Sequence, residues 1–186
     1  MSDAQILALG LYVVAIMALI VIWVRQYQKV PPNKAMVVYG RKQRRTMKGY
    51  QVITGGGKFI QPFYEKFAFL SLEARPLNLA LNNVRVDTHN EKVIIALIAN
   101  SVVRISSDPR LLELAAVNLM EKPDKDINHL AMNIIEGHVR NTCARTPLEE
   151  IKNNFPDVSL VITTAANEDL NKVGLEMVSF NIVDVH

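Results

Sequence analysis

Residues 77–105 read LNLALNNVRVDTHNEKVIIALIANSVVRI, which is two long extended runs joined by a polar stretch. In both runs apolar residues recur at every second position, as expected of a strand that buries one face. The alternation is clearest at Leu77, Leu79, Leu81, Val93, Ile95 and Leu97. We therefore predict strands over residues 77–86 and 92–105 with a turn between them. The second run is almost continuously apolar, which indicates a strand covered on both faces.

Helical signals follow this hairpin. Asp108 and Pro109 offer an N-cap and a proline at the first helical position, which predicts a helix ending near Met120. Apolar residues at helical spacing predict a second helix over residues 126–143, with Ile134 in the middle of its buried face.

Boundary residues mark two further helices and a last strand. Thr146-Pro147-Leu148-Glu149 has the capping-box pattern that opens a short helix. Asp157 is expected to cap a helix over residues 158–173 that ends at Gly174, and residues 175–185 are expected to form a strand. Strands followed by helices and one returning strand predict an α+β domain, with helices packed on a mostly antiparallel sheet.

Shorter strands are predicted upstream, over residues 35–39, 50–53 and 66–72, and residues 59–63 are expected to form a short strand or a loop. Between them Gly55-Gly56-Gly57 forms a loop that is free to adopt positive φ. It does not match a phosphate-binding P-loop, because Val52 stands where the first glycine belongs and Phe59 replaces the magnesium-binding hydroxyl. We therefore expect no nucleotide site there.

The N-terminal run from Ile6 to Val24 is nineteen residues long and contains no charged residue. As a helix it spans roughly 28 Å, close to the ~30 Å hydrocarbon core of a bilayer. A signal peptide is disfavoured because no Lys or Arg precedes the run and no small-residue cleavage pattern follows it. A buried core helix of this length would show a polar stripe.

We therefore predict a transmembrane helix over residues 6–24, after a short tail (1–5) and before a juxtamembrane linker (25–33) and a domain over 34–186. The membrane-spanning residues would include Ile6, Leu11, Val14, Ile20 and Val24, and Trp23 and Tyr27 would lie at the membrane interface. Basic residues follow the run and none precedes it, which by the positive-inside rule places the C-terminal side in the cytoplasm.

Charge is distributed unevenly along the chain. Residues 25–66 hold ten Lys and Arg against Glu65 alone, whereas residues 67–186 carry a net charge of −5. The basic segment is expected to meet anionic lipid headgroups, through Arg25, Lys29, Arg41, Lys42, Arg44, Arg45 and Lys48. A competing apolar contact with the membrane is expected from Phe59, Ile60 and Phe63.

Two other interpretations of the basic residues in 41–45 remain. The simpler one is a solvated turn that contacts no partner. Nucleic-acid binding is disfavoured, because no aromatic interleaving or recognition motif accompanies the basic residues.

Patterns for catalysis or metal binding are weak. His89, His129, His138 and His186 show no metal-ligand spacing on a helix, and Asp87, His89 and Glu91 alternate only where a turn is expected. Cys143 is the single cysteine, so it forms no internal disulfide, and with no activating group nearby it is expected to be a packing residue. We expect no catalytic residue, no metal and no cofactor.

Several segments resemble flotillins, members of the band-7 (SPFH) superfamily. They are residues 55–63 (GGGKFIQPF), residues 136–140 (EGHVR), residues 146–151 (TPLEEI) and residues 173–185 (VGLEMVSFNIVDV). They occur in the family's order and spacing, and the resemblance covers about residues 30–186.

The resemblance implies an SPFH domain in a bacterial-type member of the family that carries an N-terminal anchor. It further implies that the protein is a scaffold that organises membrane microdomains. It also implies homo-oligomerisation through a coiled coil expected beyond residue 186, and client membrane proteins as partners. Two alternatives stay open. One is a band-7 regulatory subunit of a membrane AAA protease, whose soluble domain lies outside. The other is a membrane-tethered enzyme that uses Cys143 or the Asp87/His89/Glu91 face.

Overall fold

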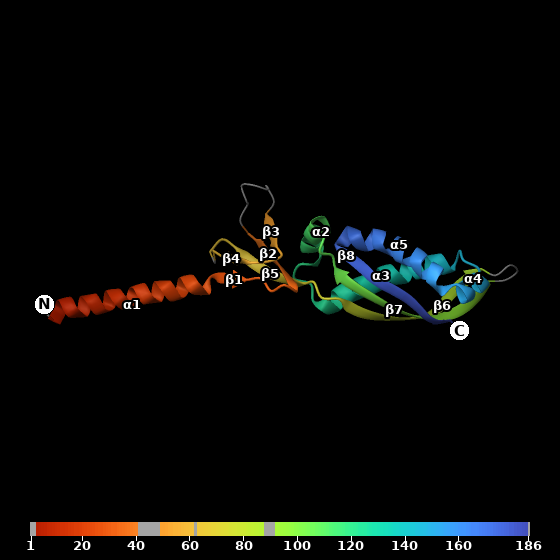
Figure 1. Ribbon diagram of the computed structural model, residues 1–186, viewed down its shortest axis with the longest axis horizontal. Coiled ribbons are helices and arrows are strands. Elements are labelled where there is room, and N and C mark those ends of the chain that lie inside the picture. Colours follow the sequence, from red (N-terminus) through yellow and green to blue (C-terminus); the bar gives the residue numbers. More distant parts are fainter. Residues whose placement is uncertain (1–2, 41–48, 62, 88–91, 186) are drawn as a thin grey trace. The chain divides into compact units, whose positions relative to one another are not determined.

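The computed structural model describes residues 3–40, 49–61, 63–87 and 92–185, without the side chains of residues 3, 4, 6–9, 87 and 92. The chain divides into two compact units, residues 1–69 and 70–186 (Figure 1).

The first unit combines one helix with two small antiparallel sheets. Helix α1 (Asp3–Arg25) leads into strand β1 (Tyr27–Lys29), which pairs with β4 (Gly57–Phe59). The other sheet has the strand order β3 (Tyr50–Ile53), β2 (Lys34–Tyr39), β5 (Lys66–Ser71). Buried side chains join the two sheets, namely Val30, Met36, Val38 and Ile60, with Ile53 packed against them.

The segment that the sequence predicts to span the membrane is helical in α1. Among the described residues, however, no helix is both long enough and apolar enough to cross a membrane. The predicted transmembrane span is therefore not confirmed.

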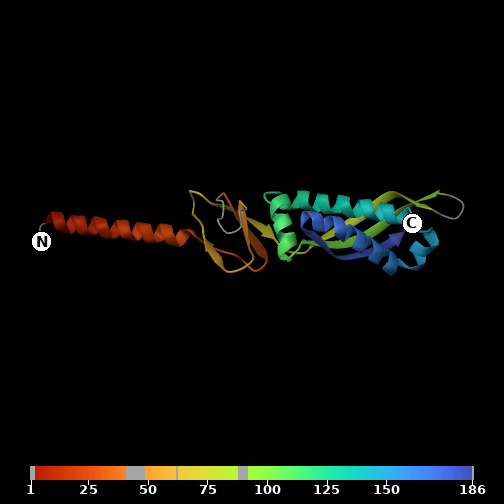
Figure 2. The ribbon, with the colours of Figure 1, turned by 90° about the horizontal axis from the view of Figure 1, so that it is seen from above.

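The second unit is a three-stranded antiparallel sheet with helices on one face. Strand β7 (Lys92–Ile105) lies between β6 (Arg75–Asp87) and β8 (Leu175–Val185). Helix α3 (Asp124–Cys143) lies along β6 and α5 (Phe155–Val173) along β8, with α2 (Pro109–Leu119) and the short α4 (Leu148–Asn153) against α5 (Figures 1 and 2). The predicted α+β class with antiparallel strands and packed helices is confirmed.

Bulges in β6 and β8 shape the outer face of this sheet. In β8, Val178 and Ser179 lie between the buried Met177 and Phe180, and Val183 and Asp184 lie between the buried Ile182 and Val185. Each bulge thus places two consecutive side chains on the face that the helices leave open.

The prediction that β7 is covered on both faces is wrong. Ile94 and Ile98 are 62% and 41% exposed, whereas Ile95, Leu97 and Ala99 are buried. All the helices that pack on the sheet lie on one side of it, so only alternate side chains of β7 are covered.

Three local predictions also change. The buried stripe of α3 is Ile127, Ala131, Ile135, Val139 and Cys143, so Ile135 rather than Ile134 lies at its centre. The Thr146 hydroxyl does not cap α4, because it donates to the Thr142 carbonyl at 2.9 Å. Asp157 lies within the first turn of α5, which begins three residues earlier than predicted.

Candidate membrane-facing site

The C-terminal end of α1 is held by the glycine-rich segment. In the β1–β4 pair, Tyr27 lies opposite Phe59 and Lys29 opposite Gly57. Two backbone hydrogen bonds extend the pairing, from Ile60 N–H to the Gln26 carbonyl (3.1 Å) and from Val30 N–H to the Gly56 carbonyl (2.9 Å). The residues that follow α1 are therefore part of a sheet and not a free linker.

Glycine is favoured at two positions of this segment for different reasons. Gly56 has φ of +77°, a conformation that side chains disfavour. A Cβ at Gly57 would lie only 2.4 Å from the Tyr27 hydroxyl oxygen, so a side chain there would displace the tyrosine ring. The glycines thus bring β4 close to β1.

Aromatic side chains gather at the same end of α1. The Trp23 ring packs on Phe59 with centroids 5.2 Å apart and planes tilted by 55°. Trp23 and Tyr27 both remain exposed, whereas Phe59 is half-buried. Exposed aromatic rings with one polar atom suit the boundary between water and lipid.

One ion pair shapes the turn that follows β4. Lys58 Nζ lies 3.4 Å from Glu65 Oε1 and 3.1 Å from Gln51 Oε1, and Glu65 Oε2 accepts from Gln61 N–H at 3.3 Å. The turn closed by these contacts leaves Phe63 and Tyr64 91% and 70% exposed. Such exposure of two adjacent aromatic residues favours a contact surface over a packing role.

The structure separates the predicted apolar contacts. Phe63 is exposed, Phe59 packs on Trp23, and Ile60 is 5% exposed inside the core of the first unit. Ile60 is therefore removed from the candidate contacts. Tyr64 was not predicted from the sequence, and its exposure adds it to Phe63 as a candidate membrane contact. The signal in the sequence was its position next to Phe63, in a turn with polar neighbours.

The other predicted residues are placed as follows. In α1, Leu11, Val14, Ile20 and Val24 are exposed, and so are Arg25 at its end and Lys29 in β1. The side chain of Ile6 and the headgroup candidates Arg41, Lys42, Arg44, Arg45 and Lys48 lie outside the described residues.

The EGHVR segment of α3 joins three elements of the second unit. Arg140 contacts Glu136 through Nε and Nη2, and its Nη1 and Nη2 donate to the carbonyls of Asn83 and Asn82 in the β6 bulge. His138 Nε2 lies 2.9 Å from Asp169 Oδ2 of α5. Hydrogen bonds from Lys172 and from His138 hold the pKa of Asp169 below its usual range. These contacts give the segment a structural role.

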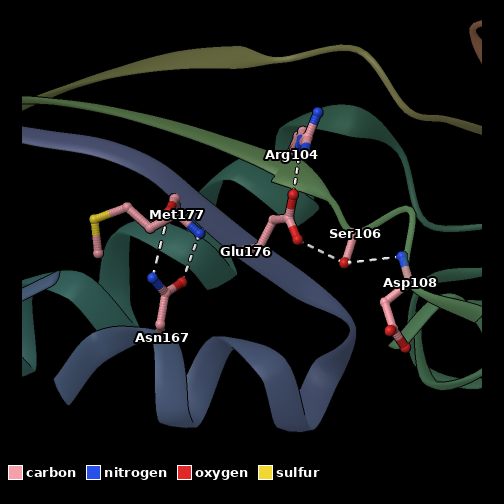
Figure 3. A network of polar contacts seen from close by, with 6 residues as sticks. All are labelled: Arg104, Ser106, Asp108, Asn167, Glu176 and Met177. Carbon is pink, nitrogen blue, oxygen red and sulfur yellow. Dashed lines mark hydrogen bonds and ion pairs between the residues drawn. The ribbon is translucent and has the colours of Figure 1, made fainter. Parts of the chain in front are cut away.

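The closing-strand segment makes a second such junction (Figure 3). Glu176 accepts from Arg104 Nε at 2.5 Å and from Ser106 Oγ at 2.6 Å, and Ser106 Oγ accepts from Asp108 N–H. Asp108 in turn caps α2, as predicted, by accepting from the backbone N–H of Arg110 and Leu111. The network thus joins β7, β8 and the start of α2.

The described residues that were candidates for an enzymatic site show no features that favour catalysis. Cys143 is fully buried, and burial raises the pKa of its thiol to about 11, so a nucleophilic thiolate is disfavoured. His89, Glu91 and the side chain of Asp87 lie outside the described residues. In the part of the chain that the structure describes, no group of three or more acidic, His or Cys side chains is placed to hold a metal ion.

Comparison with known proteins assigns the family. The sequence profile described as "SPFH domain / Band 7 family" matches residues 28–186, most of the chain. The chain belongs to the SPFH domain / Band 7 family.

The chain is also similar to individual curated proteins named as flotillins. The chain is 27% identical to Flotillin-like protein FloT of Bacillus subtilis (strain 168), over 100% of this chain and 37% of the relative. It is 29% identical to Flotillin-1 of Carassius auratus and 27% identical to Flotillin-1 of Homo sapiens, over 83% of this chain and 35% of each relative. The predicted resemblance to flotillins is confirmed, and the SPFH chain spans about a third of the length of these relatives.

Proposed function

We propose that this SPFH protein is a non-enzymatic membrane scaffold. In this proposal α1 anchors the chain in the cell membrane, and the SPFH domain lies on the cytoplasmic side. There it self-associates and organises membrane microdomains with client membrane proteins. The similarity to flotillins supports the scaffold role. The observation that carries the membrane role is the aromatic group at the end of α1, where the β1–β4 pair holds Trp23, Tyr27 and Phe59.

The proposed anchor is the whole apolar run of the printed sequence. It begins at Ile6, before the described side chains, and as a helix its length to Val24 is roughly 28 Å. The exposed apolar side chains of α1 need a non-aqueous environment, because leaving them in water costs about 25 cal/mol per Å² of apolar surface. Trp23 and Tyr27 would then lie at the cytoplasmic interface.

The exposed turn suggests a second contact with the lipid surface. Phe63 and Tyr64 project from the same unit that holds the end of α1, and Lys58 and Glu65 fix the turn that carries them. We propose that both rings enter the headgroup region, where aromatic side chains are favoured. Arg25, Lys29 and the basic residues of 41–48 would add attraction to anionic lipids.

Trp23 is the only tryptophan, so its fluorescence tests the anchor in the unmodified full chain. With the chain reconstituted in vesicles, lipids brominated near the headgroups should quench Trp23 more strongly than lipids brominated near the bilayer centre. A fluorescence spectrum of water-exposed tryptophan without quenching by either lipid would reject the anchor.

The turn is tested by moving the reporter. The full-length Trp23→Phe/Phe63→Trp variant should also be quenched by the shallow lipids, and Trp23→Phe/Phe155→Trp is the matched control in the second unit. Raising salt should reduce the quenching at position 63 in anionic vesicles but not in neutral ones, since charges are screened over ~8–10 Å. Equal lack of quenching at positions 63 and 155 would reject the turn contact while leaving the anchor intact.

A further inference from the structure

The helix-free face of the β6–β7–β8 sheet carries a row of three asparagines. Asn78 pairs with Asn100, and Asn100 pairs with Asn181, so the row crosses all three strands. All three side chains are exposed. Figures 1 and 2 show α3 and α5 over the opposite face, and no described helix of this unit covers the row.

Apolar side chains flank the row on both sides. The flanking positions are Ala80 and Ile98 on one side and Pro76 and Val102 on the other. In β8 each bulge places an apolar residue beside the polar register partner, Val183 beside Asp184 and Val178 beside Ser179. Val178 and Val183 are the bulge residues of β8, and they are 55% and 54% exposed. A largely exposed surface of apolar side chains around a polar row is typical of a contact between proteins.

We propose that this face, called here the asparagine face, binds the asparagine face of a second copy of the chain. The inference deepens the proposed self-association and in that respect rests on the proposed function. An asparagine amide carries both donors and an acceptor, so the row can hydrogen-bond to its own copy. A two-fold axis along the row brings Asn100 opposite Asn100 and exchanges the two apolar flanks. The face is thus self-complementary, as a two-fold interface must be.

The charges on the asparagine face also favour binding of a second copy of the chain over binding of a charged partner. Residues 70–186 hold eleven Lys and Arg against sixteen Asp and Glu, a net charge of −5 that opposes close approach of two copies. On the asparagine face the described charges balance, because Arg104 pairs with Glu176 at 2.5 Å and Arg85 and Asp184 have opposite signs. Two copies can therefore meet there without net repulsion.

The size of the face predicts a weak contact. Three strands about 4.8 Å apart and about 11 residues long give roughly 500 Å² per copy, and so about 1,000 Å² in total. That area lies at the lower limit of specific interfaces, so we expect a reversible dimer that membrane attachment strengthens by raising the local concentration.

Disulfide cross-linking of the full chain in mild detergent tests the geometry. Cys143 is buried and should not react, so Asn100→Cys introduces the one reactive thiol. On oxidation Asn100→Cys should form a covalent dimer roughly tenfold faster than Asn133→Cys, an exposed position on α3, as expected for about 1.4 kcal/mol of preferred contact. Equal cross-linking at positions 100 and 133 would overturn the proposal.

Opposite charges at position 100 give a second, independent measurement. Asn100→Asp and Asn100→Lys should each sediment as a monomer in detergent, because like charges then face each other across the two-fold axis. An equimolar mixture should form dimers again. A misfolded variant would not be rescued by mixing, so two monomeric variants without rescue, each with the circular dichroism of the unmodified chain, would also overturn the proposal.

These results are separable from those on the proposed function. Cross-linking at position 100 without quenching of Trp23 would keep the asparagine face and reject the anchor. Dimers that form equally well with Asn100→Asp would keep the self-association and reject the asparagine face. Vesicle binding lost with Ile98→Lys, without a change in dimer mass, would assign the face to lipid and overturn the proposal.

Discussion

Neighbouring positions on α3 differ sharply in burial. The effect of an introduced charge on stability should therefore differ between them. Ile135 is fully buried, while Asn133 is exposed two residues away. Ile135→Asp should lower the free energy of unfolding by about 3–5 kcal/mol, because it creates a cavity and buries an unpaired carboxylate. Asn133→Asp should change it by less than about 0.5 kcal/mol. Urea unfolding of the full chain, followed by circular dichroism, measures both, and equal losses would refute the assigned buried face.

The thiol of Cys143 should make stability fall at alkaline pH. Burial disfavours the thiolate and raises the pKa of this thiol in the folded chain from its ordinary value of 9.0 to about 11. Between these values the unfolded chain releases the proton and the folded chain keeps it, so unfolding becomes more favourable as pH rises. The full effect is about 2–3 kcal/mol, since each pKa unit corresponds to ~1.4 kcal/mol.

Comparison with Cys143→Ala isolates this effect from the titration of lysines and tyrosines. From pH 8 upward, the unfolding free energy of the unmodified chain should fall relative to that of Cys143→Ala. The difference between the two proteins should be constant below pH 8. A difference that does not vary with pH would mean that the thiol ionises equally in both states.

At the scale of elements, Gly174 decides how α5, β8 and α2 meet. Its φ is +87°, and a Cβ there would lie 2.3 Å from the backbone nitrogen of Ala115 in α2. Gly174→Ala should therefore cost more than about 2 kcal/mol, through backbone strain and a backbone clash together. Gly137→Ala is the matched control, because outside its own turn of α3 no described atom lies within 4 Å of its Cβ position.

The control should change stability in the opposite direction. Alanine is favoured over glycine inside a helix by up to about 1 kcal/mol, so Gly137→Ala should raise the melting temperature. A Gly174→Ala chain as stable as the unmodified one would show that α2 can move away from the helix end. Thermal unfolding followed by circular dichroism measures both variants.

At the scale of the whole molecule, the charge distribution predicts the orientation in the membrane. Positive charge follows the apolar run and none precedes it, which favours retention of the following domain in the cytoplasm. In bacterial cells, a reporter enzyme active only outside the cytoplasm should be silent when fused after His186, and a cytoplasmic reporter should work. Activity of the outside reporter would instead favour the regulatory-subunit alternative.

Local sequence signals placed several element boundaries. The strands predicted over residues 50–53, 92–105 and 175–185 are observed with those bounds, and Asp108 and Gly174 cap α2 and α5. These features depend on alternation, on one capping side chain or on one positive φ, all of which act within a few residues. The flotillin resemblance likewise depended on local motifs, and it identified the family.

The tertiary structure decided the features that depend on distant residues. The sequence could not show that β4 pairs with β1, that Ile60 fills a core, or that only one face of β7 is covered. An apolar side chain has the same local pattern whether it packs inside or projects from a turn, as Ile60 and Phe63 show. By itself the sequence determined the elements, the charge asymmetry and the family. The fold alone decided which apolar residues remain exposed, because burial depends on what the rest of the chain brings to each side chain.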